Sequence, residues 1–150
     1  MSAKRFVVLV VGLIAAAFVL VPATSPVRAD DRPDTTLFMN LTTDDTWTAT
    51  MALTYAGKVR EAGYPVVVFL NVRGVHVASK NFPPDRYGPG DKTPKELLEG
   101  LIAAGATAYV CPVCSKNAGL AEADWVDGAK PGGPETIKIQ MAPKTKVMSY

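Results

Sequence analysis

The stretch Pro65-Val66-Val67-Val68-Phe69-Leu70-Asn71 is almost continuously apolar and rich in β-branched side chains. Strands of a parallel sheet have this composition because helices cover both of its faces. Two other short apolar runs, Thr36 to Leu41 and Ala106 to Cys111, suit buried strands as well. Thr145 to Tyr150 is typical of a final edge strand. The 65–71 stretch therefore predicts the middle of a largely parallel sheet.

Helix signals separate these strands. Thr42 to Asp45 supplies N-cap side chains for a helix expected at 46–62, whose stripe of Ala52, Tyr55, Ala56, Val59 and Ala62 has helical spacing. Thr93-Pro94-Lys95-Glu96 is a capping-box sequence and predicts a second helix that ends at Gly105. A short helix is expected at 112–118, and the Pro- and Gly-rich 81–92 stretch is expected to be a loop. This alternation predicts a right-handed α/β fold.

The first 29 residues have the features of a secretory signal peptide. Lys4 and Arg5 precede an apolar run of 16 residues at 6–21, and a polar stretch ends at Ala29. That run is shorter than the roughly 20 residues that span a bilayer, although an uncleaved membrane anchor is the alternative. We expect cleavage after Ala29 and one exported, periplasmic domain at 30–150. No stable membrane association is expected after cleavage.

Charge and cysteine content limit the function further. Loss of Lys4, Arg5 and Arg28 with the leader leaves 13 basic and 14 acidic residues, so nothing in the composition indicates nucleic acid as a partner. Exported proteins meet oxidising conditions, in which a cysteine either forms a disulfide or takes part in the protein's chemistry. The chain has two, Cys111 and Cys114.

These cysteines form a Cys-x-x-Cys pair where a predicted strand meets a predicted helix. Ligands bind parallel sheets at the carboxyl ends of the strands, which groups Cys111 with Asn40, Asn71 and Arg73. A helix N-terminus favours the thiolate form of Cys111, and Lys116 or Arg73 would add positive charge. Cys114, one turn further on, is placed to attack a sulfur bonded to Cys111. The pattern predicts a nucleophilic thiol and a resolving thiol.

Other interpretations remain open at this stage. The pair could be a structural disulfide or two buried thiols. A metal site is not expected, because zinc sites use four ligands and the chain offers one cysteine pair and one histidine. That histidine, His76, could donate a proton to a substrate or could be a partly buried, hydrogen-bonded residue. Asp44 and Asp45 could be general acids, but helix capping explains at least one of them.

The order of several short motifs resembles the DsrE/DsrF-like sulfur-relay family. A strand leads into Asn71-Val72-Arg73-Gly74-Val75, then come a long loop, a helix and Cys111, and Gly119-Leu120 follows eight residues later. A closing Lys146-Val147-Met148-Ser149-Tyr150 strand completes the likeness, which covers about 35–150. The resemblance implies a three-layer fold with about five mostly parallel strands, a helix at 134–142 and trimers or hexamers. It also implies that Cys111 carries a persulfide.

The resulting hypothesis is a DsrE-type sulfur-handling protein. Cys111 would carry or transfer sulfane sulfur, with Cys114 as resolving or partner thiol, and Asn40, Asn71, Arg73, His76 and Lys116 would bind the substrate. Sulfur donor and acceptor proteins or small sulfur species would be its partners, and no cofactor is expected. Whether it acts as a sulfurtransferase or a carrier stays open. The alternatives are a periplasmic thiol-disulfide oxidoreductase and a non-enzymatic oligomeric binding module with a structural cysteine pair.

Overall fold

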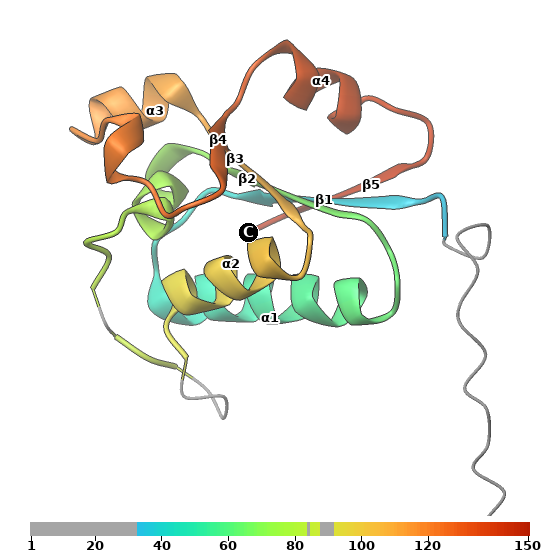
Figure 1. The fold of residues 1–150 in the computed structure, drawn as a ribbon, viewed down its shortest axis with the longest axis horizontal. Coiled ribbons are helices and arrows are strands. Elements are labelled where there is room, and N and C mark those ends of the chain that lie inside the picture. The colour runs from blue at the N-terminus through green and yellow to red at the C-terminus, as the bar shows by residue number, and fades with distance from the viewer. Residues whose placement is uncertain (1–32, 84, 88–91) are drawn as a thin grey trace, which may run out of the picture.

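Five parallel strands form the centre of the molecule, in the order β4-β3-β2-β1-β5 (Figure 1). The computed structural model describes residues 33–83, 85–87 and 92–150, and the predicted leader at 1–29 lies outside them. The α/β class and the number of strands are as predicted, and the sheet is wholly parallel. The strands are β1 (Thr36–Leu41), β2 (Val66–Leu70), β3 (Thr107–Val110), β4 (Ala129–Pro131) and β5 (Thr145–Ser149).

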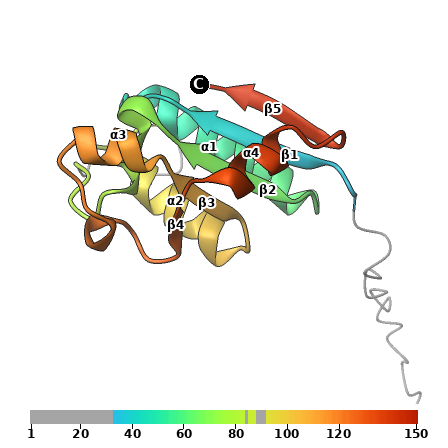
Figure 2. The same cartoon turned by 90° about the horizontal axis from the view of Figure 1, so that it is seen from above.

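Four of these strands match the predicted runs to within one residue at each end. Strand β5 lies at one edge beside β1, as expected (Figure 2). Strand β4 was not predicted, because three residues that include Lys130 and Pro131 carry no strand pattern. It forms the other edge of the sheet. An edge strand tolerates proline because one of its sides has no neighbouring strand to which a backbone N–H would donate.

Two helices cover one face of the sheet, α1 (Thr46–Glu61) and α2 (Pro94–Ala103) (Figure 1). The predicted capping box of α2 is present: Thr93 Oγ1 accepts from the Glu96 N–H, and the Glu96 carboxylate accepts from the Thr93 N–H. These helices bury alternate strand residues, among them Met39, Val68 and Val110. This face holds the main hydrophobic core.

The predicted apolar stripe of α1 was partly wrong. The helix buries Ala49, Ala52, Leu53 and Ala56, whereas Tyr55 is 45% exposed. The buried face of α1 consists mostly of small alanine side chains, and Tyr55 lies outside this face. Large apolar side chains, those of Trp47, Met51 and Tyr55, are instead exposed on α1.

Helix α4 (Pro134–Gln140) lies over the opposite face and makes the third layer (Figures 1 and 2). It confirms the helix that the resemblance implied at 134–142, although α4 ends at Gln140. Below it, the ring centroids of Phe38 and Phe69 lie 6.0 Å apart. A Cβ on Gly132 would come within 2.9 Å of the Phe69 ring, so the chain before α4 rests on that ring.

The remaining elements gather at the carboxyl ends of the strands. They are the 3₁₀ helices η2 (Val72–Ala78) and η3 (Glu122–Asp124) and the short helix α3 (Pro112–Asn117), which packs against η2. Of the predicted 81–92 loop, 84 and 88–91 lie outside the described residues. In the described ranges, no helix has the length and apolar character needed to cross a membrane.

Candidate functional site

The two cysteines lie at the carboxyl end of β3. The Cys111 N–H donates to the Leu70 carbonyl at 2.9 Å, which ties the end of β3 to the end of β2. Cys111 is the N-cap of α3 and Pro112 occupies its first turn, as the sequence predicted. Both cysteines are free thiols and both are half-buried. They are therefore open to a reaction partner while one side of each is enclosed.

Cys114 opens into a cavity of about 350 Å³. Arg73 and His76 from η2 line the same cavity, so three of the predicted site residues meet there. Burial raises the pKa of the Cys114 thiol, and a hydrogen bond to Cys111 raises this pKa further. A backbone hydrogen bond from Val72 acts in the opposite direction. Cys114 is thus held as a neutral thiol that contacts Cys111.

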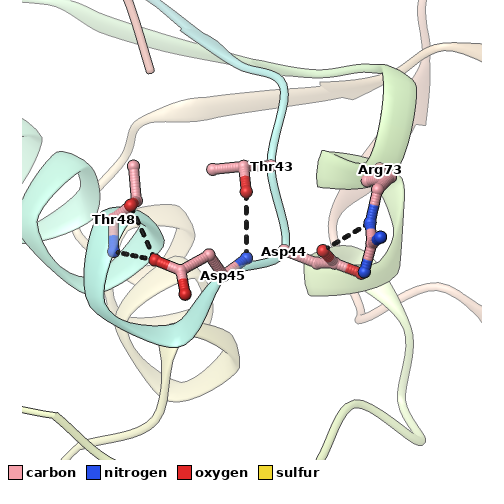
Figure 3. Close-up of polar contacts among 5 residues, drawn as sticks. All are labelled: Thr43, Asp44, Asp45, Thr48 and Arg73. Carbon is pink, nitrogen blue, oxygen red and sulfur yellow. Dashed lines mark hydrogen bonds and ion pairs between the residues drawn. The ribbon is translucent and has the colours of Figure 1, made fainter.

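Arg73 is fixed by an acidic partner that follows β1. Its Nε donates to Asp44 Oδ1 at 2.8 Å and its Nη2 donates to Asp44 Oδ2 at 3.2 Å (Figure 3). The hydrogen bonds to Asp44 and its charge raise the pKa of Arg73 above its ordinary value. Arg73 and His76 also line a second polar cavity of about 610 Å³, together with Asp44 and Asp45. The two cavities therefore share a wall.

Asp45 has a structural role. Its Oδ1 accepts from the Thr48 N–H at 2.9 Å and from the Thr48 hydroxyl at 2.6 Å, which caps α1 (Figure 3). The Thr48 hydroxyl, followed by the Thr48 backbone, lowers the pKa of Asp45. Of the two neighbouring carboxylates, one caps a helix and the other orients Arg73. The capping interpretation of Asp45 fits this geometry.

A row of polar side chains crosses the ends of three strands. Asn71 Nδ2 donates to Asn40 Oδ1 at 2.5 Å, and Asn40 Nδ2 donates to Ser149 Oγ at 3.2 Å. Asn40 and Asn71 are thus together, as predicted, and Asn71 continues β2 beside Cys111. Lys116 is exposed on α3 and does not line the Cys114 cavity. Among residues 33–83, 85–87 and 92–150, no three acidic, histidine or cysteine side chains gather as metal ligands.

Residues 35–150 match the model of the DsrE/DsrF-like family. This chain belongs to that family. Membership indicates a role of the sulfur-relay type. Two proteins similar in sequence are described as uncharacterized, MJ0989 of Methanocaldococcus jannaschii and MK0008 of Methanopyrus kandleri, at 38% and 36% identity over 81 residues. Each match covers 53% of this chain, and 66% and 62% of the relatives, so the chain spans less than two thirds of their length.

Solved structures of DsrE-like proteins share this fold. The YchN protein of E. coli superposes with a TM-score of 0.64 at 18% identity, over 77% of this chain and 98% of YchN. MTH1491 of Methanobacterium thermoautotrophicum, a protein of unknown function, has a TM-score of 0.64 at 12% identity, over 78% of this chain and all of its own. At these identities the likeness concerns the fold alone.

Sequence reasoning missed two features of this DsrE/DsrF-like site. Val72 has a φ of 48°, and it is the one residue other than glycine with positive φ in the described ranges. A β-branched residue rarely adopts this conformation, so a valine at this position does not predict a positive φ. Beneath α3, Trp125 Nε1 donates to Ser115 Oγ at 2.9 Å, and Ser115 Oγ donates to the Leu120 carbonyl at 3.0 Å. A tryptophan ten residues away is not a recognisable partner in sequence.

Proposed function

We propose that this protein accepts sulfane sulfur on Cys111 and that Cys114 is the partner thiol. The observation that carries the proposal is the contact of two free thiols at the carboxyl edge of a DsrE-type sheet, one of them in a cavity with Arg73 and His76. A purely structural disulfide would need neither the cavity nor the polar side chains around it.

The transfer step needs no external oxidant. The Cys111 thiolate attacks the outer sulfur of a donor persulfide, the donor S–S bond breaks, and the donor leaves as a thiolate. An acceptor thiolate can then take the outer sulfur from Cys111 in the same way. Alternatively, the Cys114 thiolate attacks Cys111 Sγ and releases hydrosulfide, which leaves a Cys111–Cys114 disulfide. A dithiol must then reduce this disulfide before the next cycle.

Polar residues around the pair would bind the sulfur species. Arg73 presents a planar cation whose orientation Asp44 fixes, and such a group suits an anionic sulfur donor. His76 lies in the same cavity and would supply a proton to a leaving thiolate. Asn40 and Asn71 would orient the substrate at the strand ends, and Lys116 would attract anions from the rim.

A thiol-disulfide oxidoreductase is the second candidate. The placement of two free thiols in the first turn of α3 supports it, and the neighbouring Cys111 is one cause of the raised pKa of Cys114. Both candidates suit an exported domain with its leader removed after Ala29. The exposed apolar side of α1 supports assembly into homo-oligomers, with trimers or hexamers as the proposed states.

Mass spectrometry after incubation with polysulfide distinguishes these functions. A carrier gains one sulfur atom on Cys111, and Cys114→Ser lengthens the lifetime of the adduct. An oxidoreductase forms the Cys111–Cys114 disulfide from a small-molecule disulfide in the wild-type protein, with release of two thiols, and its Cys114→Ser variant gains no sulfur atom from polysulfide. If the reduced wild-type protein and Cys114→Ser both stay unmodified, Cys111 is not a sulfur acceptor.

A further inference from the structure

A third cavity lies at the opposite end of the sheet from the cysteines. It has a volume of about 350 Å³ and lies between the C-terminal half of α1 and the edge strand β5, where Tyr55, Val59, Lys146 and Met148 line it. The start of β1 at Thr36 lines it too. Pockets that hold small molecules have volumes of about 300–1,000 Å³. This α1–β5 cavity is therefore large enough for one small ligand.

The cavity exists because α1 does not cover the whole sheet. The helix packs mainly over β1 and β2, whereas β5 is the edge strand (Figure 2). Lys146 of β5 pairs with Leu37 of β1, a core residue on the face that α1 covers. Two residues further along, Met148 pairs with Met39 of the same core. Side chains of paired residues point to the same face, so Lys146 and Met148 face the helical layer beside α1.

Apolar and aromatic side chains make up most of the cavity wall. Leu37 is buried, and Val59 and Met148 are partly buried against the core. Tyr55 and Tyr64 remain 45% and 39% exposed beside them. Covering such a wall with ligand carbon is favourable, because burial gains about 25 cal/mol for each Å² of apolar surface. The wall consequently suits the apolar part of a ligand.

The charge at this cavity is positive. Lys58 and Lys146 line it, and no acidic side chain from 33–83, 85–87 or 92–150 does so. Lys58 donates to the Glu61 carboxylate at 2.8 Å, which compensates part of its charge. Lys146 has no ion-pair partner in the same ranges. An anion is therefore favoured over a cation, with Lys146 as its main partner.

The end of α1 determines which way the ligand lies. The helix ends at Glu61, and its last carbonyls carry partial negative charge. These carbonyls repel an anion at Ala62, on the helical wall of the cavity, whereas Lys146 attracts it on the strand wall. The anionic group consequently belongs at β5, and the apolar part belongs between Val59 and Met148.

We propose that the α1–β5 cavity binds a small free carboxylate with a single apolar chain, a ligand of the fatty-acid class. Its carboxylate contacts the Lys146 ammonium, and its chain packs against Val59 and Met148. This site is separate from the sulfur chemistry, because it lies at the amino end of β1 and the cysteines follow the carboxyl end of β3. The cavity volume suits one short chain.

Titration with octanoate, followed by two-dimensional amide NMR of the protein, tests this site. We expect saturable shifts of the backbone amide signals of Leu37, Val59 and Met148. Acetate has the same charge without the chain, and octylamine has the same chain with the opposite charge. Each should bind about tenfold more weakly than octanoate or worse, because it lacks one of the two contacts.

Two cavity variants, each with a matched control, locate the ligand. Lys146→Gln removes the unpaired cation and should weaken octanoate binding about three- to fivefold. Lys138→Gln makes the same charge change on exposed α4 and should have no effect. Ala62→Phe fills the cavity and should weaken binding about tenfold. Its control is Ala104→Phe, because Ala104 ends α2 with nearly the same backbone conformation and does not line the cavity.

Three results would overturn the proposal. Shifts confined to Trp47 and Met51 would place the anion on the exposed side of α1 outside the cavity. Equal octanoate affinity in the wild-type protein, Lys146→Gln and Ala62→Phe would show that neither contact exists, and unchanged amide signals distant from each substitution establish that the variants are folded. If dilution of the protein shifts the Met148 signal and octanoate does not, a second copy covers the cavity instead of a carboxylate.

Discussion

The Arg73 guanidinium and the Asp44 carboxylate form a two-point ion pair that joins η2 to the chain segment after β1. The Arg73 side chain is exposed, whereas Asp44 is largely enclosed, so the pair presents a cation to solvent at the rim of the Cys114 cavity. Exposed ion pairs stabilise folds little. The arrangement therefore orients a charge more than it stabilises the fold.

Arg73→Ala should slow sulfur loading from thiosulfate about five- to tenfold, because the anion loses an oriented donor. The free energy of unfolding should change by less than about 1 kcal/mol. Loading rates from mass spectrometry and urea unfolding measure the two effects. Lys58→Ala, which removes an exposed ion-paired cation far from the cysteines, is the control. A large loss of stability with normal loading would show that the pair is structural.

The raised pKa of Cys114 predicts how stability depends on pH. The unfolded thiol ionises near its usual pKa of about 8.5, and the folded thiol ionises at higher pH because burial and Cys111 oppose the charge. Between these values the unfolded state loses a proton that the folded state keeps, so the free energy of unfolding falls as pH rises. The full contribution is present below the unfolded pKa.

Urea unfolding between pH 7.5 and 10 under reducing conditions measures this slope. Cys114→Ser should flatten the profile, since serine does not titrate in this range. A wild-type slope equal to that of Cys114→Ser would show that burial does not hold this thiol neutral in solution.

Much of this site follows from sequence because local signals and topology agree. The run at 65–71 identified the central strand, and the rule for strand ends placed Asn40, Asn71 and Cys111 at one edge. The remainder depends on tertiary contacts that leave no local pattern. Asp44 pairs with an arginine 29 positions away, and the Val72 conformation is imposed by β1. Such features become visible only when the packed strands are known.

Thr50 offers a route to a more stable protein. It is 6% exposed on α1, and its hydroxyl has no hydrogen-bond partner within the described part of the chain. Thr50→Val keeps the shape and removes the desolvated hydroxyl, so we expect about 1 kcal/mol of added stability. Thr54→Val, at an exposed position of the same helix, is the matched control and should have little effect on unfolding. A loss of stability in Thr50→Val would indicate that the hydroxyl has a partner in solution.

Ser115 connects the cysteine helix to the buried Trp125. Ser115→Ala leaves the Trp125 Nε1–H without its acceptor, and we expect a loss of about 1–3 kcal/mol. The tryptophan emission should change at the same time, because the polar partner of the buried indole is gone. Trp125→Phe combined with Ser115→Ala should recover part of the loss, as the unpaired donor is removed. Equal stability of Ser115→Ala and the wild-type protein would contradict this account.

The proposed homo-oligomers are tested at the exposed side of α1. Trp47, Met51 and Tyr55 recur every four residues along the exposed side of this helix, and Tyr87 stacks on Trp47 with ring centroids 4.8 Å apart. Met51 is 50% exposed at the centre of this surface, so Met51→Lys should lower the mass measured by light scattering from oligomer to monomer. Glu99→Lys on exposed α2 makes a larger charge change elsewhere and should leave the mass unaltered. A wild-type protein that is already monomeric at high micromolar concentration would rule out assembly through this helix.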